Sequence, residues 1–379
     1  MIKNLIIKAK QSFHKYHPMK VVYLIMNPRK DQQLYIHIGM PKTGSSAIQA
    51  FLALNEEYLK NNDCAYPNHQ GFLQAFQTSA GNARELDVWI KNHNTKIFNR
   101  FLTKIRTKKV ILSSELLYSK LRDCPEKFAS FFANYNIKII CYIRDMGDLA
   151  ESCSNQLIKN HNVVDYTNFE NNIKGFNYYE CLIRATQHIN IDKIIVKKYE
   201  KNGFYQGNIY ADFMQILDLE LDDSVNYPEK FVNPSLCRDA LEFRMIFNKS
   251  LYDKKDVKLK YALNSVLAKY SVEKYKDSHS KEKFLLINPN MRSVIKEKYQ
   301  KIENKFLSLF FPNTDSQLFQ KKPIKYKKYN GLSIEKISEI FRFIKTHDNT
   351  LYASLLDFTY NELADKKDKQ KILTATKLR

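Results

Sequence analysis

A lysine inside a short loop bounded by glycines is the residue of this sequence best placed to do chemistry. The segment Gly39 to Ser46 reads GMPKTGSS and has the glycine spacing of a Walker-type phosphate loop. A Walker loop carries its lysine directly after the second glycine, whereas here Ser45 follows Gly44 and the lysine is Lys42. A lysine after the glycine reaches terminal phosphates that are held with magnesium. A lysine before it can lie beside the bond that breaks, so the loop predicts transfer of an anionic group.

The elements on either side of this loop are suited to position it. The preceding run LYIHIG (34–39) predicts a strand, and Ser46 to about Lys60 predicts an amphipathic helix, with Ile48, Phe51, Leu52 and Leu59 on its apolar side. A loop between a strand and a helix N-terminus offers backbone N–H groups and the positive end of the helix dipole to an anion. This context favours a phosphate-binding role over a chance turn.

Strand-like and helix-like patterns alternate through the first half of the chain. Apolar runs at 110–114, 137–143 and 193–199 predict further strands, and helices are expected at about 147–159 and 210–219. Such alternation is typical of a parallel sheet with helices on both faces. The predicted fold class is therefore α/β, with three layers, a central parallel sheet and a P-loop-like phosphate loop. From about Asn233 onward the pattern is mainly helical, which predicts a helical C-terminal region.

Two more candidate residues follow predicted strands. Arg144 ends the run CYIR, and Ser152 comes eight residues later in the next helix. A guanidinium can form a fork of charge-assisted hydrogen bonds with a phosphate, and a serine can add one more. The alternative is that Arg144 pairs with Asp145 or Asp148 at the surface.

Glu115 closes the run VILSSE (110–115). A carboxylate at the end of a strand can act as a general base. Alternatively, Glu115 caps the next helix or binds a lysine. His37, inside the first strand, is expected to be a buried core residue and not a catalytic group.

Together these motifs resemble the sulfotransferase superfamily, and in particular a bacterial, carbohydrate-directed branch with an S-S-E signature. The loop resembles the 5′-phosphosulfate-binding loop P-K-[ST]-G-[ST]-[ST], and Arg144 with Ser152 resembles the 3′-phosphate-binding motif of that superfamily. In weaker form the resemblance runs from about Leu34 to Phe311, including the segments 176–182, 197–200 and 232–236. The glycine-rich basic loop of the cytosolic branch is not found.

The resemblance implies a sulfotransferase that moves a sulfuryl group from 3′-phosphoadenylyl sulfate (PAPS) to a hydroxyl of a carbohydrate or glycolipid, without a metal. It implies catalytic roles for Lys42 and Glu115. The cofactor-binding residues that it implies are Lys42, Thr43, Gly44, Ser45, Ser46, Arg144 and Ser152. Asn233 and Ser235 are weaker candidates for the nucleotide pocket.

Two other functions stay open. One is a P-loop kinase-like phosphotransferase, which would depend on magnesium. The other is a non-catalytic basic protein that binds glycan or nucleic acid, since 61 Lys and Arg against 40 Asp and Glu give a net charge of +21. The basic residues form no long block, and no nucleic-acid-binding motif is present, so nucleic acid is not the expected partner.

The cysteines and the first 30 residues indicate where in the cell the protein is expected. Six widely spaced cysteines, without a C-x-x-C pair, argue against a disulfide framework or a zinc site. The apolar runs of the first 30 residues are broken by lysines and fall short of the ~18 residues of a membrane span. The sequence predicts a cytoplasmic protein, with peripheral contact at the inner membrane surface as a further hypothesis. The expected divisions are a basic extension (1–33), a sulfotransferase domain (34–311) and a C-terminal helical extension (312–379).

Overall fold

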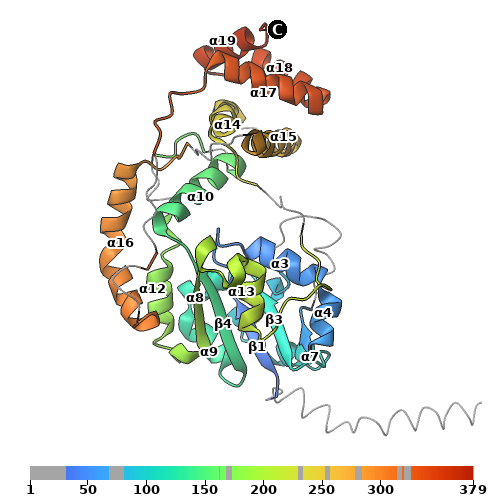
Figure 1. Cartoon of the computed structure of the whole chain (residues 1–379), viewed down its shortest axis with the longest axis vertical. Coiled ribbons are helices and arrows are strands. Elements are labelled where there is room, and N and C mark those ends of the chain that lie inside the picture. The colour runs from blue at the N-terminus through green and yellow to red at the C-terminus, as the bar shows by residue number, and fades with distance from the viewer. Residues whose placement is uncertain are drawn as a thin grey trace, which may run out of the picture. The chain divides into compact units, whose positions relative to one another are not determined.

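The computed structural model describes residues 31–67, 81–161, 163–167, 173–228, 234–251, 257–277, 284–313, 318–319 and 326–378. The basic segment of residues 1–30 therefore lies outside the described residues, as does Asn233. Figure 1 labels the helices and strands of the chain, which divides by compactness into two units. Unit 1 comprises Met1–Arg144, Tyr178–Val232 and Lys305–Asp315, and unit 2 comprises Asp145–Asn177, Asn233–Asn304 and Ser316–Arg379.

Unit 1 is built on a five-stranded sheet in which every neighbouring pair of strands is parallel. The strand order is β2-β3-β1-β4-β5, so β1 lies at the centre between β3 and β4. The strands are β1 (Gln33–His37), β2 (Cys64–Ala65), β3 (Lys109–Ser113), β4 (Asn136–Ile143) and β5 (Ile194–Lys198). Because all strands run the same way, the segments that follow β1, β3 and β4 leave the sheet at the same edge, where parallel α/β sheets bind ligands.

One face of the sheet is covered by helices that flank the loop. Side chains that alternate along the strands, including Tyr35, Ile111 and Tyr142, pack with α3 (Ser45–Leu54), α4 (Glu56–Asn61) and α13 (Ile209–Ile216) in one buried cluster. Strand residues buried on both faces of a sheet are apolar almost throughout, and β4 (NIKIICYI) shows this pattern.

The opposite face packs against a second group of helices. Leu112 of β3 lies among side chains of α6 (Arg84–Lys91) and α7 (Thr95–Leu102). Cys141 of β4 lies close enough to Tyr118 of α8 (Leu116–Asp123) to raise the pKa of that tyrosine, and Cys181 of α12 (Tyr178–Ala185) lies close enough to raise the pKa of Cys141. The helix α9 (Pro125–Phe132) contacts α6, α8 and α12. Helices thus cover both faces, and the predicted three-layer α/β fold with a central parallel sheet is confirmed.

The predicted helix from Ser46 to about Lys60 is divided in the structure. α3 ends at Leu54 and α4 begins at Glu56, with Asn55 between them. The Asn55 side-chain amide donates to the Phe51 carbonyl at 2.7 Å, and its oxygen accepts the N–H of Asn226 at 2.7 Å. An asparagine that bonds nearby backbone in this way competes with the helical pattern, and the sequence periodicity does not reveal that competition.

Unit 2 is helical, as predicted for the C-terminal region. Its elements include α10 (Met146–Asn160), α14 (Arg238–Leu251), α15 (Val257–Asp277), α17 (Ile334–His347), α18 (Asn349–Asn361) and α19 (Lys366–Ala375). Phe243 and Phe247 of α14 pack on Phe341 and Phe358 of the last helices, with ring centroids 5.2 and 6.0 Å apart. The long helix α16 (Pro289–Phe310) is shared by the two units.

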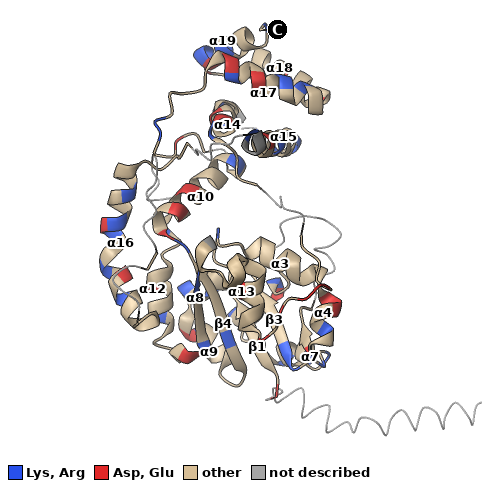
Figure 2. Cartoon of the chain, in the orientation of Figure 1, with Lys and Arg blue, Asp and Glu red and all other residues tan. Residues whose placement is uncertain are grey.

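The charges are distributed within each unit. Figure 2 shows Lys and Arg residues along many helices, interspersed with Asp and Glu. All six cysteines are free thiols. Over the described ranges, the helices include none with the length and apolar character needed to cross a membrane.

Candidate active site at the carboxyl edge of the sheet

The loop between β1 and α3 is tightly curled. Three of its residues have positive φ angles: Gly39 at 48°, Lys42 at 65° and Gly44 at 81°. Glycine adopts such angles freely, but for lysine this conformation carries a free-energy cost of about 1–2 kcal/mol. The positive φ of Lys42 points to a functional role for the loop, because strained backbone of this kind clusters at functional sites.

Two buried hydroxyls fasten the loop from within. The Thr43 hydroxyl donates to the Met40 carbonyl at 2.7 Å, and the Ser45 hydroxyl donates to the same oxygen at 3.1 Å. Both residues are almost fully buried. Their hydroxyl protons are therefore committed to the loop, and what Thr43 and Ser45 can offer an anion is a backbone N–H group.

The start of α3 is suited to an anion. Gly44 occupies the N-cap position, and among the described residues no side chain caps this helix N-terminus. The first N–H groups of a helix lack intrahelical partners and carry the positive end of the helix dipole. Ser46, in the first turn, is half-buried and keeps accessible surface.

Glu115 lies beside the loop, directly after β3. A Cβ atom added to Gly39 would lie 3.1–3.2 Å from the backbone N, the Cα and the Cγ of Glu115, so the glycine permits this close approach. Glu115 occupies the N-cap position of α8, yet its side chain forms no capping hydrogen bond. The carboxylate is thus not used as a structural cap, which was one alternative for this residue.

The electrostatics of Glu115 tie it to Lys42. Glu115 is an exposed residue, yet the protein atoms packed around its carboxyl group disfavour the charged form and raise the pKa above its usual value. The Lys42 ammonium is near enough to lower the same pKa in part. The structure therefore brings together a lysine and a carboxylate with a raised pKa, a property common among catalytic acids and bases.

Arg144, directly after β4, reaches the same loop. One guanidinium nitrogen donates to the Lys42 carbonyl at 3.0 Å, and the guanidinium carbon lies 5.4 Å from the centre of the Tyr199 ring. The Tyr178 hydroxyl donates to the Arg144 carbonyl. The contacts of Arg144 in unit 1 are thus directed to the loop and to two tyrosines.

The predicted alternative for Arg144 was an ion pair with Asp145 or Asp148. Those carboxylates face a different arginine within unit 2: Arg292 donates to Asp148 at 2.9 Å and lies 3.7 Å from Asp145. The Asp145 side chain also caps α10 by accepting the Asp148 N–H at 2.9 Å.

Ser152 belongs to unit 2, where it is half-buried on α10. Ser235 is exposed in the same unit. Lys42, Thr43, Gly44, Ser45, Ser46, Glu115 and Arg144 are the predicted site residues that unit 1 brings together.

His37, the last residue of β1, is wholly buried. Its Nδ1 lies 2.8 Å from the Ser113 hydroxyl oxygen, which also accepts the Gln49 amide at 3.0 Å. Burial lowers the pKa of His37 to about 3, so the imidazole is neutral at physiological pH. A histidine enclosed in this way braces β1 against the end of β3 and has no access to a substrate.

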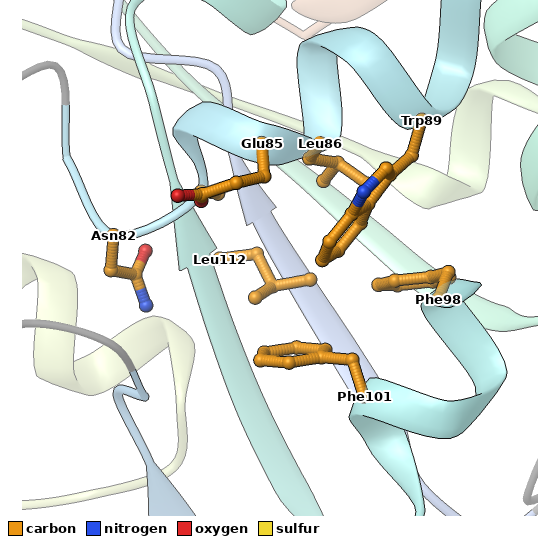
Figure 3. A pocket seen from close by; sticks show the side chains of 8 residues that line it. Asn82, Glu85, Leu86, Trp89, Phe98, Phe101 and Leu112 are labelled. Carbon is orange, nitrogen blue, oxygen red and sulfur yellow. The ribbon is translucent and has the colours of Figure 1, made fainter. Parts of the chain in front are cut away.

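A small cavity lies near the end of β3 (Figure 3). Its volume of about 10 Å³ is room for about one water molecule and not for a sugar ring. The cavity is lined by Asn82, Ala83, Glu85, Leu86, Trp89, Phe98, Phe101 and Leu112. We therefore place no acceptor in it.

Tyr199 is a site residue that sequence reasoning missed. A Cβ atom on Gly44 would lie 2.8 Å from the Tyr199 ring, and the same ring faces Arg144. The Tyr199 N–H donates to the Ile143 carbonyl at 2.6 Å, which fixes its backbone to the end of β4. The segment 197–200 was part of the weak family resemblance, but nothing in the sequence pattern singled out its tyrosine.

Comparison with known proteins adds little to this geometry. No protein-family model matches the chain. A stretch of 127 residues is 32% identical to an uncharacterised protein of Archaeoglobus fulgidus, and it covers 34% of this chain and 34% of that protein. The similarity thus spans about a third of the relative's length.

Proposed function

We propose that this chain is a sulfotransferase that moves a sulfuryl group from PAPS to a hydroxyl of a carbohydrate or glycolipid. The observation that carries the proposal is that the Lys42 ammonium lies near enough to lower the pKa of Glu115, which itself packs against Gly39 of the same loop. The lysine stands within the loop and does not follow Gly44. It is therefore near Glu115, a carboxylate that can accept a proton. This combination suits in-line attack by a neutral hydroxyl on an anionic group.

The residues divide the chemistry as follows. As the acceptor oxygen forms its bond to sulfur, the bond between sulfur and the bridging oxygen breaks, and the 3′,5′-bisphosphate leaves with that oxygen. Lys42 stabilises the negative charge that develops on the bridging oxygen, an electrostatic contribution that is largest in the transition state. The N–H groups of Gly44, Ser45 and Ser46 hold the 5′ group, and Glu115 takes the acceptor proton.

The raised pKa of Glu115 fits this role. A carboxylate with a pKa closer to neutrality accepts a proton more readily than an ordinary glutamate does. The Lys42 ammonium opposes this rise in the pKa, because a positive charge nearby favours the carboxylate form. Arg144 is proposed to recognise the 3′-phosphate, which distinguishes the donor from other adenine nucleotides.

The donor assignment is tested by nucleotide binding without magnesium. In the presence of EDTA, 3′-phosphoadenosine 5′-phosphate should raise the unfolding temperature, because a ligand that binds only the native state stabilises it by about 2.7 kcal/mol at 100 times its Kd. Adenosine 5′-phosphate should do so far less. Differential scanning fluorimetry measures both shifts, with ATP as a third ligand.

Other outcomes identify the rivals. A shift with ATP that requires magnesium would indicate a kinase-like phosphotransferase. Equal shifts with all three nucleotides, which vanish steeply as salt is added, would indicate a general polyanion binder. Lys60→Ala is a matched control for Lys42→Ala in the corresponding transfer assays, because Lys60 is an exposed lysine of α4.

The acceptor class rests on the family resemblance and on the basic charge of the chain. Mass spectrometry of polysaccharide and lipid extracts, from cells with and without the gene, should reveal a sulfate mass difference. Transfer of labelled sulfate from PAPS to the fraction that changes would then identify the acceptor. Extracts without such a difference would contradict the proposed acceptor class.

A further inference from the structure

The conformation of the loop raises the question of what holds Lys42 in place. Lysine seldom adopts a positive φ angle, and the φ of 65° at Lys42 must be maintained by contacts around it. The hydroxyls of Thr43 and Ser45 fasten Met40, two residues earlier. They do not contact the carbonyl of Lys42 itself.

The contact at that carbonyl comes from the neighbouring strand. Arg144 donates to the Lys42 oxygen at 3.0 Å across 102 residues of sequence. A peptide unit is planar, and its N–H and C=O point in opposite directions. By holding the Lys42 carbonyl, Arg144 therefore also fixes the direction of the Thr43 N–H.

A flip of this peptide would harm an anion site. It would turn a carbonyl oxygen, which repels an anion, toward the place where an N–H group had pointed. A charge-assisted hydrogen bond from a guanidinium is among the stronger restraints that a side chain can apply. Arg144 is well suited to prevent the flip.

Arg144 is itself held in position. Its carbonyl accepts the Tyr178 hydroxyl, and its guanidinium lies over the Tyr199 ring at 5.4 Å. The Tyr199 ring also packs beside Gly44, at the other end of the loop. These contacts fix the side chain from β4 before any ligand arrives.

We propose that Arg144 is a positioning residue for the phosphate loop, in addition to any contact with a 3′-phosphate: its hydrogen bond to the Lys42 carbonyl holds the loop in its anion-binding conformation. The proposal deepens the proposed function and rests on it for the identity of the ligand. It implies that loss of Arg144 weakens ligands that have no 3′-phosphate at all.

Binding of two nucleotides to Arg144→Ala tests this directly. Loss of the hydrogen bond from Arg144 to the Lys42 carbonyl should weaken the binding of adenosine 5′-phosphate by about 10-fold or more. This factor corresponds to the free energy of a hydrogen bond to a charged group. 3′-Phosphoadenosine 5′-phosphate should weaken by at least the same factor. Isothermal titration calorimetry measures both dissociation constants, and Arg100→Ala serves as a matched control because Arg100 is an exposed arginine of α7. Unchanged affinity for adenosine 5′-phosphate, with weakened binding of the bisphosphate alone, would overturn the proposal.

Hydrogen exchange tests the positioning role of Arg144 independently of the proposed function. In nucleotide-free protein, Arg144→Ala should speed amide exchange at residues 42–45, while exchange within β4 stays as in the wild type. Equal exchange in both proteins at residues 42–45 would also overturn the proposal. This measurement needs no ligand, so it remains informative if the wild type binds neither nucleotide and the sulfotransferase assignment fails. Should Arg144→Ala not fold, Tyr178→Phe removes the hydroxyl at the Arg144 carbonyl, and it should speed exchange at the same residues to a smaller extent.

Discussion

Charged side chains gather both at the carboxyl edge of the sheet and in unit 2, but the carboxyl groups of the two regions differ in their hydrogen bonds. In unit 2, the carboxylate of Asp239 accepts hydrogen bonds from Lys274 at 2.7 Å, Lys336 at 2.8 Å and the Tyr329 hydroxyl at 2.7 Å. We call these four residues the Asp239 cluster. At the sheet edge, Glu115 has a lysine nearby, yet its side chain makes no capping bond and its pKa is raised.

The two carboxyl groups shift in opposite directions for physical reasons. Burial alone would raise the pKa of Asp239, but the hydrogen bonds from Lys274, Lys336 and Tyr329 outweigh it and leave the pKa below its usual value. At Glu115 the protein atoms around the carboxyl group raise the pKa by more than the Lys42 ammonium lowers it. A charge that is fully satisfied stabilises a fold, whereas one that is not remains available for chemistry.

Of the substitutions that this contrast suggests, Glu115→Gln should have the largest effect on turnover. Glu115→Gln keeps the shape of the side chain but removes the proton acceptor, so turnover should fall by about 10²–10⁴-fold. Sulfate transfer from PAPS measures the loss, and nucleotide affinity should stay close to that of the wild type. Glu126→Gln, at an exposed position of α9, is the matched control. Near-normal turnover of Glu115→Gln would show that the base lies elsewhere.

The Asp239 cluster should respond in the opposite way. Asp239→Asn weakens the hydrogen bonds of two partly exposed ammonium groups to a buried carboxylate, which should lower the free energy of unfolding by about 1–3 kcal/mol. Turnover per folded molecule should stay unchanged. Chemical denaturation measures the loss, with Asp223→Asn at an exposed position as control. Because the native pKa of Asp239 is lowered, its contribution is present above the usual carboxyl pKa and is lost as the pH falls. A stability equal to that of the wild type at neutral pH would remove the contrast between the two regions.

Lys42 should again affect chemistry and not the fold. Lys42→Ala should reduce turnover by about 10²–10³-fold, since its interaction grows as charge develops on the leaving oxygen. Acceptor affinity should be nearly intact, and stability should stay within about 0.5 kcal/mol of the wild type. Steady-state kinetics separate these effects. A change confined to the KM for the acceptor would contradict the electrostatic role.

The sequence predicted the parts of this site that are local. The loop motif, the strand before it and the helix after it are adjacent in the chain, so their residue types alone predicted the strand, loop and helix N-terminus that the structure has there. The sheet order β3-β1-β4 was not in the sequence pattern, and it is this order that brings Glu115 and Arg144 to Lys42. The positive φ at Lys42 was equally hidden, because lysine has no preference for it.

Side-chain directions were the other part that sequence could not supply. The residue types of the loop do not reveal that the Thr43 and Ser45 hydroxyls donate to the Met40 carbonyl. The role of Tyr199 depends on β5 lying beside β4, where its ring meets Gly44 and Arg144. Each of these contacts is set by packing between segments that are far apart in the chain.

The smallest expected effect concerns the stability of Glu115→Gln, and it decides whether the two carboxyl groups truly differ. The native pKa of Glu115 is raised above its usual value of 4.5, so the native state holds this proton to higher pH than the unfolded state does. The stability of the wild type relative to Glu115→Gln should therefore be greatest below pH 4.5, and should fall as the pH rises through the native pKa. Above that range the variant should be slightly the more stable protein. Denaturation midpoints of both proteins from about pH 4 to pH 8 measure this difference. The opposite trend, with the variant weaker at neutral pH and equal to the wild type in acid, would mean that Lys42 holds Glu115 as Lys274 and Lys336 hold Asp239. Glu115 would then be a structural ion-pair partner, and the case for a general base at the end of β3 would fail.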